Sequence, residues 1–300
     1  MKKEEKQMIM GHGLALFTIL VWGTTFVATK ALLRSFTALQ IMLMRFCIAW
    51  IVLMVLTGWK RKPRQKVNWR DEGGIFLLAM SGVTLYYLFE NTALNYTLAS
   101  NVSILVAAAP IMTAILAHVF TRDEKLTKHT WMGFAVAMTG VVLVVFNGTY
   151  VLKLNPLGDA LSILAAFSWA VYSILLKKYI MKYDNLVLTR KISFYGLITT
   201  APLALGMDGS FSLAPLGEPS MLFCILFLGL LGSGICYVTW NVSVKYLGVV
   251  KTNNYIYLSP FITMVTAALV LDEKITAAGL AGAVLIVGGI VLSERGGKGC

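Results

Sequence analysis

Residues 87–96 of this chain read YLFENTALNY, and residues 237–246 read YVTWNVSVKY. A shift of 150 positions aligns the two stretches at both terminal tyrosines and at the central asparagine, and it also places Pro110 on Pro260. Further matches keep the same order along the chain: Trp22 with Trp169, Lys30 with Lys177, Gly133 with Gly282 and Gly140 with Gly289. The second half of the chain therefore repeats the first.

The composition is that of a membrane protein. Hydrophobic residues make up 58% of the 300 positions and charged residues only 13%, which is too apolar for a soluble domain of this size. A membrane-spanning helix needs about 20 apolar residues, and ten continuous apolar runs meet that need. They lack the period-two alternation of barrel strands. The runs cover residues 11–30, 37–57, 74–95, 99–120, 131–148, 157–178, 187–207, 219–242, 249–271 and 277–294.

These runs predict an all-α integral membrane protein of ten transmembrane helices in two five-helix repeats. The predicted units are residues 1–148, a linker at 149–156, residues 157–294, and a tail at 295–300. We interpret the first apolar run as a retained helix, because it is longer than a signal-peptide core and has no small-residue cleavage site. Two inverted copies of a membrane unit can hold a site between them that faces either side in turn. This organisation is typical of transporters.

The positive charges predict the orientation. With the N-terminus in the cytoplasm, 21 of the 26 Lys and Arg residues fall in segments on the cytoplasmic side, and four fall outside. This bias predicts a multi-pass protein of the cell (inner or plasma) membrane with both termini in the cytoplasm. The loop before residue 74 carries six cations, whereas its repeat equivalent between the seventh and eighth predicted helices carries none. Equivalent loops therefore face opposite sides, as inverted repeats require. Topology also explains the basic cluster at 60–70 better than nucleic-acid binding, whose motifs are absent.

Several motifs, in this order and spacing, resemble the drug/metabolite transporter superfamily, and specifically its EamA type. They are Trp22-Gly23, Arg45-Phe46, Ala93-Leu94 with Tyr96 and Pro110, Ser168-Trp169-Ala170, and Ser259-Pro260 with Asp272-Glu273. The resemblance covers nearly all of the chain. It implies two inverted EamA repeats of five helices each and transport of a small metabolite, often export of amino acids or related compounds. It does not name the substrate.

The sequence shows few motifs of other functional classes. No Gly-rich loop ends in Lys-Ser or Lys-Thr, so a gradient rather than ATP is expected to supply the energy. No catalytic motif appears, and the four cysteines show neither metal-ligand spacing nor a disulfide framework. We therefore expect no catalytic residues, no metal and no cofactor. Two rival classes remain open: a membrane-embedded lipid-handling protein or enzyme, and a membrane scaffold that transports nothing.

Two charged residues lie within the predicted spans, at similar depth from the outer side. Arg45 is in the second span and Glu90 in the third. Charges at this depth are costly and usually face protein or water, so we expect the two to pair or to share a polar cavity. A fixed ion pair, a gate and a substrate-headgroup site all fit this pattern. Glu90 is also a candidate proton carrier, which makes the proton a possible coupling ion.

A cavity for an amphipathic metabolite needs apolar faces with polar tips, and aromatic and amide side chains supply them. Interfacial anchoring, packing and backbone capping are the structural alternatives. Trp22 and Trp169 are the strongest candidates because they are repeat-equivalent and lie deep in their helices. The other candidates for binding or gating are Tyr86, Asn91, Tyr172, Tyr237, Asn241, Asn254 and Tyr257.

Pro110 and Pro260 are repeat-equivalent and lie in the middle of predicted spans. A proline there removes a helix hydrogen bond, so we expect each to bend or loosen its helix. A hinge for alternating access and a static kink both fit this prediction.

Overall fold

The structure is a computed structural model that describes residues 3–59, 67–97, 99–121, 127–146, 155–207, 212–271 and 277–295. Its elements form ten consecutive helical segments within these residues. The segments are α1 (Lys3–Leu32); α2 (Ala38–Trp59); α3 (Trp69–Ala79), η1 (Met80–Leu85) and α4 (Tyr86–Tyr96); α5 (Ala99–Val106) and α6 (Ala109–Phe120); α7 (Lys128–Phe146); α8 (Pro156–Ile180); α9 (Asn185–Met207); α10 (Pro219–Leu226), η3 (Phe227–Ile235) and α11 (Cys236–Leu247); α12 (Val249–Asn254), η4 (Tyr255–Leu258) and α13 (Ser259–Leu271); and α14 (Ala277–Arg295). A short 3₁₀ turn, η2 (Ala214–Gly217), precedes α10.

Local sequence signals set several of the helix ends. At the start of α2, the Thr37 amide donates to Gln40 Oε1 (3.1 Å) and the Gln40 amide donates to Thr37 Oγ1 (3.2 Å), a reciprocal capping box. Asn155 caps α8 by accepting from the Gly158 amide at 3.1 Å, and a proline follows it. Between α11 and α12, Gly248 adopts φ +84°, a conformation that favours glycine.

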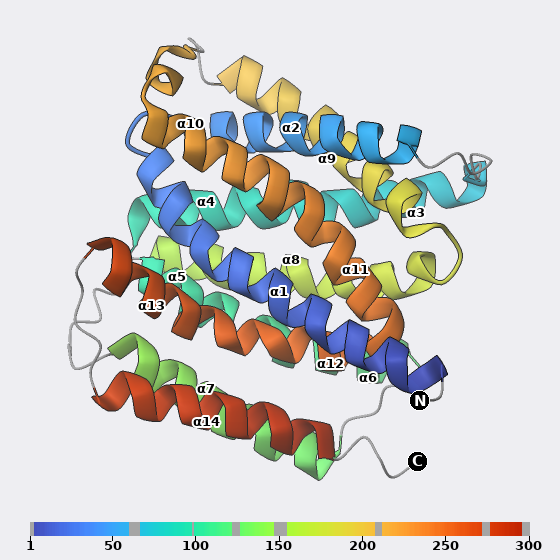
Figure 1. Cartoon of the computed structure of the whole chain (residues 1–300), viewed down its shortest axis with the longest axis vertical. Helices are drawn as coiled ribbons and strands as arrows, with labels where there is room; N and C mark the ends of the chain where they lie inside the picture. Colours follow the sequence, from blue (N-terminus) through green and yellow to red (C-terminus); the bar gives the residue numbers. More distant parts are fainter. Residues whose placement is uncertain are drawn as a thin grey trace.

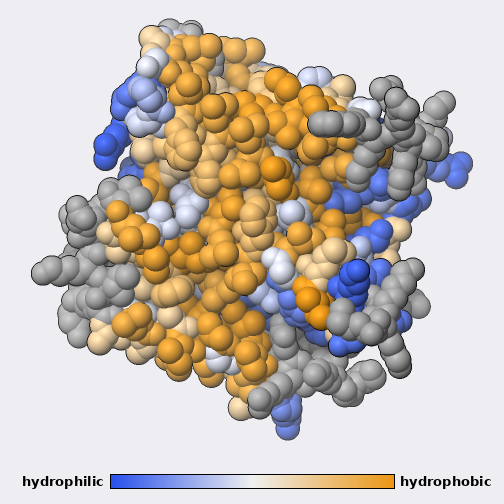
Figure 2. Space-filling view, viewed as in Figure 1, coloured by the Kyte–Doolittle hydropathy of each residue, from blue (hydrophilic) through white to orange (hydrophobic). Residues whose placement is uncertain are grey.

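The surface is that of a protein surrounded by lipid. Figure 2 shows an apolar band across the middle of the molecule, with the hydrophilic residues gathered toward its left and right edges. Many large apolar side chains are exposed along the helices, including Val55, Leu205, Leu269 and Val284. Five of the described helical segments are long and apolar enough to cross a membrane by length and composition. The first residues of α1 and the last residues of α14 lie on the same side of the bundle (Figure 1).

Helices α7 and α14 lie side by side at one edge of the bundle (Figure 1). Their glycines explain the close approach: a Cβ added at Gly133 would lie 2.6 Å from the Gly289 carbonyl oxygen, and one at Gly140 would lie 2.5 Å from that of Gly282. The small-residue pattern of the two helices therefore serves packing within one chain.

The first half of the chain contacts the second throughout the bundle. Helix α1 packs against α11 and α13, α2 packs against α9 and η3, and α4 packs against α8. The main cluster of buried apolar residues draws on both halves, with Phe46 and Tyr87 from the first and Trp169, Tyr172 and Trp240 from the second. The centre of the protein is thus an interface between the two repeats.

Candidate functional site

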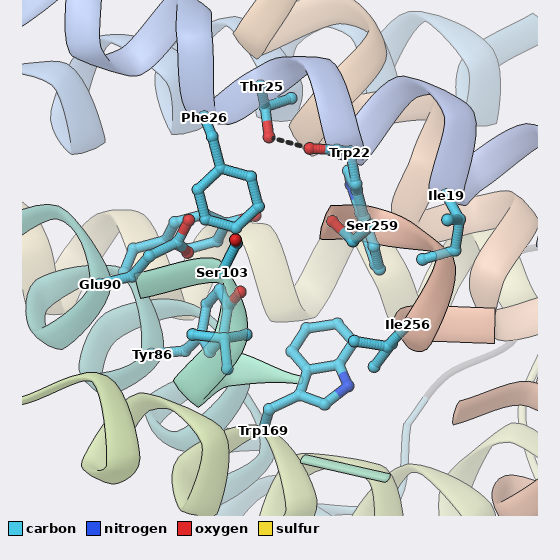
Figure 3. Close-up of a pocket in the computed structure, with 12 residues that line it drawn as sticks. Ile19, Trp22, Thr25, Phe26, Tyr86, Glu90, Ser103, Trp169, Ile256 and Ser259 are labelled. Carbon is cyan, nitrogen blue, oxygen red and sulfur yellow. Dashed lines mark hydrogen bonds between the residues drawn. The ribbon is translucent and has the colours of Figure 1, made fainter. Parts of the chain in front are cut away.

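A pocket opens at this central interface, with walls from both halves of the chain. Figure 3 shows α1 side chains on one side of it, Tyr86 and Glu90 on another, and Trp169 and Ile256 below. Its lining is mostly apolar or aromatic, with a few hydroxyl groups and one carboxylate. The lining residues are Ile19, Trp22, Thr25, Phe26, Tyr86, Tyr87, Glu90, Ser103, Val106, Trp169, Ile256 and Ser259. Such a lining suits a ligand with an apolar body and few polar groups.

The two repeat-equivalent tryptophans meet in this pocket. The rings of Trp22 and Trp169 are 5.2 Å apart at an interplanar angle of 87°, an edge-to-face contact. Trp240 lies 5.1 Å from Trp22, and Tyr172 lies 4.9 Å from Trp169. Edge-to-face pairs add stability beyond their buried area and fix the orientation of the rings. The pocket therefore has an ordered aromatic wall.

Hydrogen bonds hold both pocket tryptophans in place. Trp22 Nε1 donates to the Gly232 carbonyl at 2.9 Å, and Trp169 Nε1 donates to Asn253 Oδ1 at 3.0 Å. A buried indole N–H is costly without an acceptor. The Asn253 amide in turn donates to the Val249 carbonyl at 2.9 Å. Each indole is thus tied to a different helical segment of the second half.

Two π-helical segments flank the pocket at repeat-equivalent positions. They are η1 and η3, and their glycines Gly82 and Gly232 are separated by the repeat shift of 150. Tyr237 Oη donates to the Gly82 carbonyl at 2.6 Å, just as Trp22 donates to that of Gly232. Each bond joins one repeat to the other. Wide helical turns expose carbonyls and are frequent at functional sites, so the two segments are candidates for local movement.

Arg45 is buried behind the pocket wall. Its Nε donates to Ser233 Oγ at 2.7 Å, its Nη2 donates to Tyr87 Oη at 3.4 Å, and its guanidinium carbon lies 4.2 Å from the centre of the Tyr87 ring. In the described part of the chain, no ion pair within 4 Å joins Arg45 to Glu90. Arg45 is not itself a lining residue, but it contacts Tyr87, which is one. A direct Arg45–Glu90 pair is therefore not formed in this conformation.

Glu90 is the charged residue of the pocket lining. Only 6% of its surface is exposed, and its Oε2 has no hydrogen-bond partner among the described residues. The equivalent position in the second repeat, 150 residues on, is the buried Trp240. The pocket is therefore chemically asymmetric, with its carboxylate supplied by the first repeat alone.

Three other predicted residues form a polar layer behind the aromatic wall. Tyr172 Oη donates to Asn241 Oδ1 at 2.9 Å, and Asn241 Nδ2 donates to Thr189 Oγ1 at 3.0 Å. Tyr237 belongs to the same layer, because its ring lies 6.1 Å from that of Tyr172. These side chains are buried and support the pocket without lining it.

The remaining predicted residues lie away from the pocket. Asn254 Nδ2 donates to Ser293 Oγ of α14 at 3.2 Å, and the Tyr257 ring lies 6.3 Å from Phe134 of α7. Asn91 is fully buried, outside the pocket lining, and its amide has no partner among the described residues. Asn254 and Tyr257 face the α7–α14 pair because their short segment presents its other side to the pocket. Asn253, their neighbour, makes the contact with Trp169.

The two prolines lie next to helix breaks rather than inside continuous helices. Pro110 is the second residue of α6, after the turn at residues 107–108, and Pro260 is the second residue of α13, after the 3₁₀ turn η4. An amide in the first turn of a helix has no intrahelical partner, so a proline there removes no helix hydrogen bond. The expected loss of one mid-helix bond is therefore replaced by a local change of helix geometry, a turn at residues 107–108 before α6 and the 3₁₀ turn η4 before α13. The hinge role stays a prediction.

Sequence reasoning missed several lining residues. Phe26 and Ser103 carry no repeat match or unusual charge that would single them out, and Ser259 stood out only as part of the Ser259-Pro260 motif. Tyr87 did match Tyr237, but nothing in the sequence showed that it stands between Arg45 and the pocket. The signal that could have found Thr25 and Phe26 is helical spacing, since both lie about one turn from Trp22.

Two ion pairs join the repeats at the end of the bundle far from Glu90. Lys182 binds the Asp71 carboxylate, which also accepts from Tyr183 Oη at 2.5 Å. Lys191 binds Glu72, which accepts from Tyr195 Oη at 2.6 Å. The hydrogen bond to Asp71 raises the pKa of the Lys182 ammonium above its ordinary value. These pairs tie the first turn of α3 to the end of α8 and the start of α9.

A bundle of ten helical segments in two similar halves, with an aromatic pocket between them, is an architecture of membrane transporters. The EamA-like transporter family matches the chain twice, over residues 9–146 and 156–295. The chain belongs to this family. This confirms the predicted all-α fold of ten transmembrane helices in two inverted repeats, and it makes the chain a multi-pass transporter of a small molecule rather than an enzyme.

Relatives match over nearly their whole length. An uncharacterized transporter of Archaeoglobus fulgidus is 32% identical, with 94% of this chain and 96% of the relative covered. A probable terminal-alkyne amino-acid exporter of Streptantibioticus cattleyicolor is 28% identical, with 93% and 91% covered. A probable amino-acid metabolite efflux pump of Escherichia coli is 27% identical, with 94% of each covered. A crystal structure at 17% identity superimposes with a TM-score of 0.79 over 97% of both chains, which shows the shared fold.

Proposed function

We propose that this protein exports a small organic metabolite, an amino acid or a related compound, through the pocket between its repeats. The observation that carries the proposal is the pocket itself: it combines apolar faces from both halves with one buried carboxylate. Two of the relatives reported above are named as exporters of amino acids or their metabolites, which supports this substrate class. The pocket residues proposed to contact the substrate are Trp22, Tyr86, Glu90 and Trp169.

The proposed mechanism is alternating access, in which one repeat rocks against the other. The ion pairs of Asp71 and Glu72 would close one end of the bundle and separate when that end opens. The segments η1 and η3 would absorb part of the movement, because each is bonded to a side chain of the opposite repeat. Pro110 and Pro260 mark further candidate hinges beside the breaks in their spans.

The proposed location is the cell inner or plasma membrane, with both termini in the cytoplasm. The excess of cations in the segments predicted to face inward supports this orientation. With it, Asp71 and Glu72 lie at the cytoplasmic end and Glu90 lies toward the outside. The proton is the proposed coupling ion. A pH gradient imposed across proteoliposomes should then drive net substrate flux.

The test of the proposed function is counterflow in proteoliposomes with amino acids and the corresponding amines. The protein should exchange a labelled substrate across the membrane, and Trp169→Ala should reduce the exchange. Trp131→Ala is the matched control, because Trp131 lies on the exposed face of α7, outside the pocket. Binding without exchange would favour a non-transporting scaffold, and exchange of lipids alone would favour a lipid-handling protein.

A further inference from the structure

The pocket holds a carboxyl group that no described Lys or Arg contacts. Glu90 lies in the lining at 6% exposure with Oε2 unbonded. The Tyr86 hydroxyl is a neutral hydrogen-bond partner for this carboxyl group, and no described cation forms an ion pair with it. A buried carboxylate without a counter-charge is costly, and a site that keeps one is prepared for a cation from outside the chain. Such a site needs an outside cation only if no nearby Lys or Arg pairs with Glu90.

Two cations on neighbouring helices, Arg45 of α2 and Lys30 of α1, make their hydrogen bonds with other groups. The donors of Arg45 reach Ser233 and Tyr87, and the guanidinium stacks over the Tyr87 ring outside the pocket lining. Lys30 donates to the Leu94 carbonyl at 2.6 Å, one turn beyond Glu90 on the same span, and it too is outside the lining. The pocket therefore offers an acidic group and no basic group to a ligand.

The rest of the lining suits the body of an amine. Rings of Trp22, Phe26, Tyr86 and Trp169 line the same pocket as Glu90 (Figure 3). The other polar groups of the lining are neutral, and they include the hydroxyls of Thr25, Ser103 and Ser259. Aromatic faces attract ammonium groups and also cover apolar chains. Because Trp240 replaces the acid in the second repeat, only the first-repeat side of the pocket can take the charged end.

From these contacts we infer that the pocket recognises a protonated primary amine on an apolar body, with Glu90 as its counter-ion, and that a substrate carboxylate is not required. This inference rests on the proposed function and specifies the chemistry of the same site. An amino acid would bind through its ammonium group and side chain. The corresponding amine without the carboxylate would bind at least as well, because no cationic side chain lines the pocket to bind the substrate carboxylate.

The test compares four compounds with one phenyl body: 2-phenylethylamine, phenylalanine, 2-phenylethanol and 3-phenylpropionate. Binding to the purified protein is measured by the ligand-dependent rise in melting temperature. We expect the amine to bind at least as tightly as phenylalanine, and the alcohol and the acid to bind at least about thirtyfold more weakly, as loss of one partner of a buried charge pair predicts. Tighter binding of the acid than of the amine would overturn the inference.

Variants separate Glu90 from a general loss of folding. Glu90→Gln keeps the shape of the side chain. It should weaken binding of the amine at least about thirtyfold and leave binding of the alcohol unchanged. Glu90→Asp should retain most of the preference for the amine. Glu218→Gln, which removes an exposed carboxylate outside the pocket and outside the proposed gate, should not change the preference.

Failure of the inference and failure of the proposed function give different results. Equal binding of the amine and the alcohol to the wild type, with counterflow of either, would overturn the role of Glu90 and leave the exporter proposal standing. Loss of the amine preference in Glu218→Gln but not in Glu90→Gln would also overturn it. No counterflow of any amine, amino acid or acid would overturn the exporter proposal alone if the amine still binds preferentially, and both if the amine and the alcohol also bind equally.

Discussion

The indole rings of Trp22 and Trp169 meet edge to face, 5.2 Å apart, across the interface between the two repeats. The two residues occupy equivalent positions in their repeats, so the sequence repetition becomes a physical contact at the pocket. Each indole also donates its N–H to the second half of the chain. The pair therefore contributes both to the packing of the two repeats and to the wall of the proposed site.

This contact should be measurable as a coupling free energy. We predict that Trp22→Phe and Trp169→Phe are non-additive in the free energy of unfolding, with a coupling of about 0.5–1.5 kcal/mol. The measurement is a double-mutant cycle in detergent micelles. Trp22→Phe combined with Trp131→Phe should be additive, because Trp131 lies on an outer face. Additivity of the pocket pair would contradict the contact.

Gly82 should be intolerant of any side chain. A Cβ at this position would lie 2.0 Å from the ring of Tyr172, which is fully buried and hydrogen-bonded to Asn241. We predict that Gly82→Ala lowers the free energy of unfolding by about 1–3 kcal/mol. Gly73→Ala, in the same span but with no atom within 4 Å of its Cβ, should raise it by about 0.5–1 kcal/mol. Thermal unfolding of the two variants decides the sign of each effect.

Adjacent glycines of α14 offer a second matched pair. A Cβ at Gly289 would lie 2.5 Å from the backbone nitrogen of Ala137, whereas one at Gly288 would meet nothing within 4 Å. We expect Gly289→Ala to separate α7 from α14 and to lower the melting temperature by several degrees, from a loss of about 1–3 kcal/mol. Gly288→Ala should leave it unchanged or slightly higher. Equal melting temperatures for the two variants would show that the helices do not pack this closely.

The ion pair between Glu72 and Lys191 should contribute little to stability. Both side chains are partly exposed, at 30% and 27%, and exposed pairs contribute about 0–1 kcal/mol. A double-mutant cycle with Glu72→Gln and Lys191→Met should give a coupling in that range. The same variants should change the counterflow rate more than the stability if the pair closes one end of the pathway. An unchanged rate would assign the pair a structural role alone.

The sequence predicted the architecture because the architecture rests on long, simple signals. Apolar runs of about 20 residues are hard to mistake, and the match of Trp22 to Trp169 stands out because it belongs to an ordered series of repeat matches. The site was harder to predict. Asn253 and Asn254 are adjacent amides that residue type alone does not distinguish, yet a rotation of about 100° between neighbours on a helix directs Asn254 to α14 and Asn253 to Trp169.

Interactions between distant residues were also beyond the sequence. Arg45 and Glu90 lie at similar depth, which predicted a pair or a shared cavity. The structure instead places Tyr87 against Arg45 and leaves Glu90 in the pocket. Which partner a buried charge selects depends on the packing of several helices at once. The π-helical segments were likewise unpredictable, because a single wide turn leaves no pattern in residue types.

The most direct test of the account asks whether substrate passes through the pocket between the repeats. Ser103 is a buried lining residue, so Ser103→Cys, made in a chain whose four cysteines are replaced by serine, puts one thiol in the pathway. Counterflow of 2-phenylethylamine or phenylalanine is then measured before and after labelling with a bulky maleimide. The account predicts that labelling abolishes the flux and that substrate slows labelling. Full flux through completely labelled protein would contradict it.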